Sequence, residues 1–151
     1  MSADTMPTVT ADVVAIRATR RRHDWRSRLH AVVVSVIHEP GSYGTNDCAL
    51  FTARCIEAIT GEDLSAPFRG TYNTRAGGLA ALAAAGFADL GEFAAANFEE
   101  IHSSQARNGD LALIDDFTCG IFSGERLAVL TPTSYGTVER EKATRAFRIG
   151  G

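Results

Sequence analysis

The sequence predicts an α+β domain in which the helices come first and the strands form an antiparallel sheet afterwards. Three observations lead to this class. Between residues 24 and 97, apolar residues recur at helical spacing. After Asn97 the chain changes to short apolar runs separated by turn residues. The 151 residues contain no internal repeat and no low-complexity linker, so one domain accounts for most of them. We assign residues 1–22 to an N-terminal arm and residues 23–151 to the domain.

Helical spacing defines the elements of the first part of the chain. The first predicted helix begins near Asp24 and ends at Pro40, and its apolar residues share one face. They are Trp25, Leu29, Val32, Val33, Val36 and Ile37. A second helix begins near Asn46, a residue that suits an N-cap, and closes at Gly61. Because the connection between them is short, we expect the two helices to pack as an antiparallel pair.

A third helix and a set of strands follow. The helix is rich in alanine, begins after Thr74 and stops at Gly86, and one or two further turns are expected between Asp89 and Ala96. The runs after it alternate with turn signals such as Ser123-Gly124. The candidate strands are Phe98–Ile101, Asp110–Asp115, Thr118–Ser123, Arg126–Thr131 and Arg145–Ile149. We expect the helices to pack on the sheet that these strands form.

Composition excludes several classes of function. A net charge of −3 gives no electrostatic basis for binding nucleic acid. No apolar run reaches the roughly 18–20 residues of a membrane span, and the first residues lack the basic-then-apolar layout of a secretion signal. Three cysteines, an odd number, rule out a complete disulfide framework. We therefore expect a protein that is made in the cytoplasm, without a membrane span and without a nucleic acid partner.

The stretch Gly44–Phe51 carries the strongest candidate for chemistry. It places Cys48 at the start of the second predicted helix, where unpaired N–H groups and the helix dipole favour a thiolate. Cysteine hydrolases of the papain type hold their nucleophile in this way. Alternatively, Cys48 is a small buried apolar residue, as free cysteines often are. The neighbouring Asp47 either opposes the thiolate by its charge or caps the helix.

A cysteine nucleophile needs a base, and the four histidines are poorly placed to supply one. They are His23, His30, His38 and His102. None falls inside a predicted strand, from which it would face the start of the second helix; only His38 and His102 come near enough to be considered. Metal and cofactor sites are not predicted, because Cys48, Cys55 and Cys119 belong to no CxxC or HxxxH pattern.

Three motifs occur in a definite order along the chain. They are Asp47-Cys48-Ala49-Leu50, Gly109-Asp110-Leu111 and Thr118-Cys119-Gly120-Ile121. Their order resembles that of the NlpC-type cell-wall peptidases of the papain-like superfamily. In those enzymes an Asp-Cys-Ser-Gly-like motif supplies the nucleophile, a Gly-Asp-Leu strand follows, and a His-Val-Gly-Ile-like strand supplies the base. By this resemblance Cys48 occupies the nucleophile position, and Thr118 stands at the position of the base histidine.

A wider set of motifs covers residues 24–149. It consists of Trp25, Tyr43-Gly44-Thr45-Asn46-Asp47-Cys48-Ala49-Leu50-Phe51, Thr60-Gly61-Glu62-Asp63, Arg69-Gly70-Thr71-Tyr72, Gly109-Asp110 and Ala146-Phe147-Arg148. This set is similar to the pattern of a family of small tailed-phage proteins derived from the same peptidase fold. That pattern has tryptophan where this chain has Tyr43 and Phe147. Such proteins look like products of the tail-tip part of phage genomes.

The resemblance implies a papain-like NlpC-type fold and a structural role in a bacteriophage tail tip or baseplate, without catalysis. The implied partners are other tail proteins: the hub, the distal tail protein and the central tail-tip protein. The implied location is the virion, after synthesis in the host cytoplasm. The N-terminal arm would then dock against neighbouring proteins.

Two other functions stay open at this point. In the first, the protein is an active cysteine peptidase or amidase that cuts peptidoglycan peptides, with Cys48 as the nucleophile. His38 or His102 would be its base, and Asp110 or Asp115 would orient that base. In the second, the protein is an adaptor or chaperone for tail assembly, which the sequence does not separate from a structural component.

Overall fold

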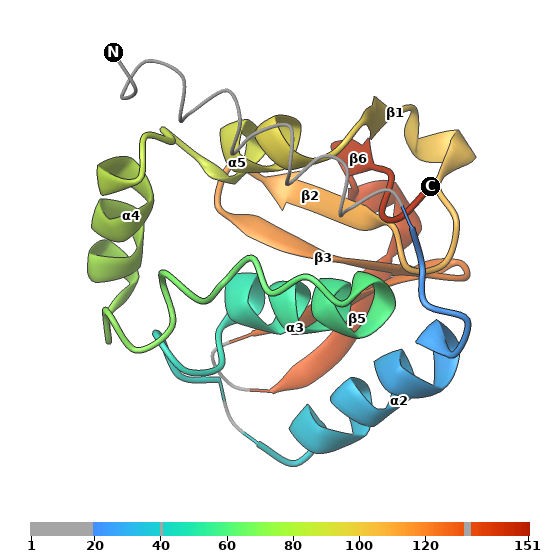
Figure 1. Ribbon diagram of the computed structural model, residues 1–151, viewed down its shortest axis with the longest axis horizontal. Coiled ribbons are helices and arrows are strands. Elements are labelled where there is room, and N and C mark those ends of the chain that lie inside the picture. Colours follow the sequence, from blue (N-terminus) through green and yellow to red (C-terminus); the bar gives the residue numbers. More distant parts are fainter. Residues whose placement is uncertain (1–19, 40, 132–133) are drawn as a thin grey trace.

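The computed structural model describes residues 20–39, 41–131 and 134–151 (Figure 1). Within these ranges four α-helices precede a six-stranded antiparallel sheet, which confirms the predicted α+β class. The helices are α2 (Trp25–Val36), α3 (Cys48–Thr60), α4 (Arg75–Ala84) and α5 (Leu90–Asn97). The strands are β1 (Glu100–Ile101), β2 (Leu111–Asp115), β3 (Thr118–Ser123), β4 (Arg126–Leu130), β5 (Tyr135–Glu139) and β6 (Arg145–Phe147). Residues 1–19 of the predicted arm lie outside the described residues.

The sheet is not built in chain order. Its strands pair in the order β1-β6-β2-β3-β4-β5, and each is antiparallel to its neighbours. The C-terminal strand β6 therefore lies between β1 and β2. Helix α3 packs against β3 and β4, and α2 packs against α3 (Figure 1). This arrangement brings the start of α3 to the sheet.

Helix α3 forms where the sequence offers both a cap and a buried stripe. The Asp47 carboxylate accepts a hydrogen bond from the Leu50 N–H at 2.9 Å, so Asp47 is the N-cap and the helix begins one residue later, at Cys48. Asn46, the cap expected from the sequence, precedes it. The helix ends at Gly61, whose φ of +89° is the left-handed conformation that glycine adopts without strain.

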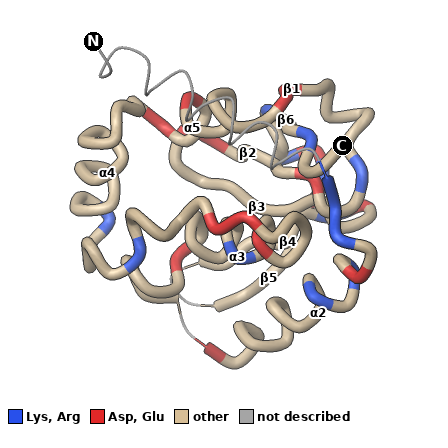
Figure 2. The backbone as a smooth tube through the Cα atoms, in the orientation of Figure 1, with Lys and Arg blue, Asp and Glu red and all other residues tan. Residues whose placement is uncertain are grey.

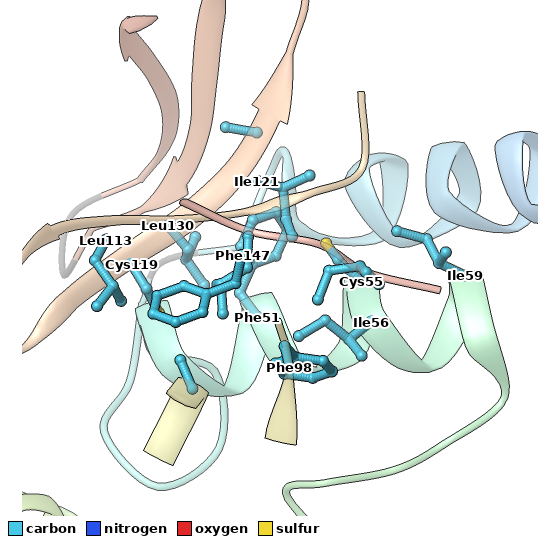
Figure 3. Packing of buried hydrophobic residues seen from close by; sticks show 14 of the residues in the cluster. Phe51, Cys55, Ile56, Ile59, Phe98, Leu113, Cys119, Ile121, Leu130 and Phe147 are labelled. Carbon is cyan, nitrogen blue, oxygen red and sulfur yellow. The ribbon is translucent and has the colours of Figure 1, made fainter. Parts of the chain in front are cut away.

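The core lies between α3 and the sheet (Figure 3). Its largest members are fully buried aromatic and aliphatic side chains from α3, β3 and β6, with the Cys55 thiol among them. These side chains include Phe51, Ile59, Ile121 and Phe147. A second, smaller cluster around Phe122 and Leu127 lies on the opposite face of the sheet. The helix that carries Cys48 is thus fixed by burial along most of its length.

Helix α2 covers α3 with most of its predicted stripe. Val36 is fully buried, and Trp25 packs against the core with the guanidinium groups of Arg21 and Arg26 over its ring, each 4.4 Å from a ring centroid. Ile37, predicted to belong to the stripe, is 44% exposed, because the helix ends at Val36 and the chain turns away.

The segment before α2 is joined to the domain. The Arg22 N–H donates to the Ile59 carbonyl at 2.7 Å. The Arg21 guanidinium donates to the Ile149 carbonyl at 2.9 Å and to the buried Asp110 carboxylate at 3.0 Å. The basic stretch leading into α2 is visible in Figure 2 beside the C-terminal end of the chain. Residues 21 and 22, assigned to the arm from the sequence, therefore contact the domain at the end of α3, at Asp110 and at Ile149.

Candidate functional site

A cavity of about 250 Å³ opens beside the start of α3. Its walls come from α3, α4, α5, the loop before α4, and strands β2 to β4, and they are mostly apolar. The apolar wall includes Phe68, Leu79, Leu82, Leu90, Phe93 and Phe98. Cys48, Thr118 and Cys119 line the same cavity, so the structure brings both residues predicted for the site, Cys48 and Thr118, to one hollow. This size and lining suit the apolar part of a small ligand.

Cys48 is half-buried at this cavity, at the first position of α3. Its Sγ lies 3.8 Å from the Phe117 carbonyl oxygen, to which the thiol donates. A second hollow of about 50 Å³, lined by Ser42, Tyr43 and Leu130 among others, also reaches Cys48. The thiol is therefore accessible to a small molecule from the cavity.

The residue that β3 presents to Cys48 is Cys119. Its thiol is buried, with Sγ 3.4 Å from the Thr52 hydroxyl oxygen and 3.7 Å from the Cys48 carbonyl oxygen, so it contacts consecutive turns of α3. Thr118 precedes Cys119 on the strand and also lines the cavity. Among the hydrogen bonds of the described residues, none joins the Thr118 side chain to Cys48. The sequence analysis missed Cys119 as a site residue. The available signal was the alternation of β3, which puts Cys119 and Ile121 on the face toward α3.

The two thiols have different acidities. A hydrogen bond from the Cys119 thiol lowers the pKa of Cys48, although burial and the nearby charges of Asp47 and Asp115 oppose the shift. The same interaction, together with burial, raises the pKa of Cys119 well above its usual value. The opposite directions of these two shifts make Cys48 the more acidic thiol of the pair.

Asp47 joins three segments around the thiol. Besides capping α3, it accepts hydrogen bonds from the Gly44 N–H at 3.1 Å and from the Tyr72 hydroxyl at 2.6 Å. Gly44 has φ of +86°, and a Cβ there would collide with the Tyr72 carbonyl oxygen. The two readings of Asp47 from the sequence therefore both hold, because it caps the helix and its charge opposes a Cys48 thiolate.

The four histidines all lie within the described ranges, and each is exposed. The ring of His102 caps the η1 turn (Ser103–Gln105), with its Nδ1 2.7 Å from the Ser104 hydroxyl. His38 follows the last turn of α2. The groups that shift the pKa of Cys48 most are Cys119, through its thiol and its backbone, and the carboxylates of Asp47 and Asp115.

The acidic residues considered as orienting groups have different surroundings. Asp110 is fully buried, and its carboxylate accepts hydrogen bonds from the Arg21 side chain and from the Ile149 and Arg107 N–H groups at 2.9–3.0 Å. Its partners join distant parts of the chain, and neither Asp110 nor these partners line the cavity. Asp115 is exposed, accepts from the Phe117 N–H at 2.9 Å, and adds its charge to the surroundings of Cys48.

A further motif pair forms a brace in the loop before α4. Asp63 accepts hydrogen bonds from Arg69 at 2.9 Å and from the Ser65 hydroxyl at 2.8 Å. The Gly70 N–H donates to the Gly44 carbonyl at 2.8 Å. The contacts of Asp63 fix the loop internally, and the bond from Gly70 to Gly44 holds it against the turn that precedes Cys48.

Other kinds of site find little support in the described part of the chain. No group of three or more His, Cys, Asp and Glu side chains there is arranged to hold a metal ion. Nor do the described helices include one long and apolar enough to cross a membrane.

Comparison with known proteins places the chain in one family. Residues 20–149 match the model of the domain of unknown function DUF6950, so the chain belongs to that family. No curated protein and no solved structure matches the sequence or the fold significantly. The matched range begins one residue before Arg21 and ends at Ile149, the two residues joined through Asp110.

Proposed function

We propose that this protein is a structural component of a bacteriophage tail tip or baseplate, built on a papain-like NlpC-type peptidase fold that has lost catalysis. Its partners would be the hub, the distal tail protein and the central tail-tip protein, and its location the virion. The proposal rests on the motif resemblance and on the surroundings of Cys48.

The main observation in support of a loss of catalysis is that the neighbour of Cys48 on β3 is Cys119. A cysteine peptidase uses an imidazole to take the thiol proton and to protonate the leaving amine. Here the neighbour on β3 is a thiol whose pKa is raised, and such a group holds its proton instead of shuttling it. General acid–base catalysis is worth about 10²–10⁴-fold, and without it amide hydrolysis at Cys48 would be correspondingly slow.

The motif carboxylates support a scaffolding role. Asp47, Asp63 and Asp110 each accept several hydrogen bonds from groups that hold segments of the fold together. Carboxylates engaged in this way stabilise the domain and are not free to act as an acid or a base at the cavity. The family motifs would then preserve a shape, which is what a tail component contributes to its neighbours.

The direct test is the composition of finished particles. Phage particles from a strain that carries this gene would be purified and their tails analysed by mass spectrometry and cryo-electron microscopy. We expect the chain in the tail tip, bound to hub proteins. A monomer that is absent from particles and has no affinity for tail-tip proteins would contradict the proposal. Presence during assembly only would indicate an adaptor or chaperone.

The competing function is an active cysteine peptidase or amidase acting on peptidoglycan peptides. The lowered pKa of Cys48 beside an apolar cavity is the observation that favours it. Iodoacetamide labelling at neutral pH separates the two functions. The enzyme predicts labelling of Cys48 that disappears in His38→Ala or His102→Ala, together with cleavage of muropeptides. Our proposal predicts labelling that both variants retain, and no cleavage.

A further inference from the structure

Cys48 and Cys119 are seventy-one residues apart in sequence, yet the Cys119 Sγ lies 3.7 Å from the Cys48 carbonyl oxygen, where β3 passes the start of α3. Cys119 contacts the Cys48 carbonyl and the Thr52 hydroxyl, one turn further along α3. Cys48 is the partner open to the cavity, whereas Cys119 is buried behind it. The third cysteine, Cys55, is buried in the core among Phe51, Ile56 and Ile121 (Figure 3).

We propose that Cys48 and Cys119 form a dithiol site that reacts with small uncharged disulfides by thiol–disulfide exchange and closes into a disulfide joining α3 to β3. The accessible thiol of Cys48 would attack, and the buried thiol of Cys119 would resolve the product. Thiol–disulfide exchange requires no imidazole, so it does not depend on whether the site can hydrolyse an amide.

The exchange takes place in two balanced steps. The Cys48 thiolate attacks one sulfur of the incoming disulfide, forms a mixed disulfide, and releases one thiolate, which takes the proton that Cys48 gave up. Cys119 then transfers its proton to the second departing thiolate as its sulfur attacks Cys48. The protein loses two hydrogens in total, and the incoming disulfide is reduced to two thiols.

The arrangement suits this order of events. Since the thiolate is the nucleophile in such exchange, the lowered pKa of Cys48 assigns the first attack to it. The largest cause of the raised pKa of Cys119 is the hydrogen bond between its thiol and that of Cys48. This hydrogen bond is lost once Cys48 is in a mixed disulfide. The resolving thiol therefore becomes easier to deprotonate only after the first step.

The cavity indicates the class of disulfide. The group left on Cys48 in the mixed disulfide would lie against the apolar wall formed by residues such as Leu82, Phe68 and Phe93. Burying a charged group against such a wall is unfavourable. We therefore expect an uncharged disulfide to react faster than a charged one.

The test uses the full-length reduced protein with two probes, bis(2-hydroxyethyl) disulfide and the charged glutathione disulfide. Intact mass and peptide mapping follow the products. The wild type should lose two hydrogens and yield a peptide pair linked through Cys48 and Cys119. Cys119→Ser should stop with one probe group on Cys48, and Cys48→Ser should not react. Cys55→Ala, the matched control, should behave as the wild type.

Other outcomes would overturn the site. A wild-type protein that keeps the mixed disulfide would exclude Cys119 as a resolving thiol. A protein that iodoacetamide labels at Cys48 while neither disulfide probe reacts would exclude thiol–disulfide exchange at Cys48. A faster reaction with glutathione disulfide would exclude the uncharged class. If Cys119→Ser does not fold, the time course of the wild type decides, since the mixed disulfide must appear first and then convert. These results do not depend on whether the protein is found in phage tails.

Discussion

Asp47 holds the surroundings of Cys48 at the scale of single residues. Replacing it by alanine removes the cap of α3 and the acceptor for the Gly44 N–H and the Tyr72 hydroxyl. We expect Asp47→Ala to lower the free energy of unfolding by about 3 kcal/mol, as the sum of a lost cap and two lost hydrogen bonds. Urea denaturation measures it. Tyr72→Phe removes one hydrogen bond alone and should lower the free energy by about 1 kcal/mol; equal effects would contradict the role of the cap.

The place of a single residue could be predicted from the sequence where its surroundings come from residues close to it in the chain. The position of Cys48 at a helix start followed from the turn and cap residues just before it. The choice between Thr118 and Cys119 did not, because a shift of one residue moves a strand side chain to the other face of the sheet. The register between β2 and β3 is irregular between Leu113 and Asp115, opposite this point, and no local pattern reveals that irregularity.

At the scale of elements, α4 packs closely against the loop before it, and the contact is made at Gly78. A Cβ on Gly78 would lie 2.9 Å from Cε2 of the Tyr72 ring. Alanine favours a helix over glycine by about 1 kcal/mol, but here it would push the ring away from Asp47. We expect Gly78→Ala to destabilise the wild type and to stabilise a Tyr72→Ala background, as measured by thermal denaturation in a double-mutant cycle. The same sign in both backgrounds would contradict this packing.

Strand β3 depends in a similar way on Gly120. A Cβ at this position would lie 2.5 Å from the Ala128 carbonyl oxygen of β4, and a backbone atom cannot move aside without disturbing the strand pair. We expect Gly120→Ala to lower the free energy of unfolding by about 2–4 kcal/mol, at the upper end of overpacking effects. Ser123→Ala, at the exposed end of the same strand, is the control and should change it by less than about 0.5 kcal/mol. Similar values for both variants in urea denaturation would refute the close approach.

Helices were easier to predict than strands because their signal repeats over several turns. The stripe of α2 and the cap of α4 at Thr74 were both readable in the sequence. Strand β5 (Tyr135–Glu139) was not predicted, since it is an edge strand with no fully buried residue and no continuous apolar run. Strand β5 forms because it pairs with β4, and its own residues carry no strand pattern from which this pairing could be predicted.

The described domain is closed by contacts between its first and last residues. Asp110, just before β2, binds Arg21 before α2 and the Ile149 N–H after β6, and β6 itself lies between β1 and β2. Such a strand order cannot be derived from local patterns, because it depends on long-range pairing. The class of fold could be predicted from the order of helices and strands along the chain. The site could not, because Cys119 and Cys48 come together only in the folded domain.

The groups buried across the domain also predict how the whole molecule responds to alkali. Burial raises the pKa of Cys55 to about 12 from an ordinary value of 9.0, and it raises the pKa of Tyr135 as well. Between pH 9 and 12 the folded state therefore holds the Cys55 proton, whereas the unfolded state releases it. The stability that this burial provides is complete below pH 9 and is lost as the pH rises toward 12.

We expect the free energy of unfolding to fall by up to about 1.4 kcal/mol per pH unit for each such group, above pH 9 for Cys55 and above pH 10 for Tyr135. Urea denaturation between pH 7 and 11 measures the slope. In Cys55→Ala the stability at pH 7 should be lower, because a buried side chain is truncated, but the decline above pH 9 should be shallower since one of the titrating groups is gone. An unchanged slope in this variant would mean that Cys55 is exposed to solvent in the folded chain, in contradiction to its place between α3 and the sheet.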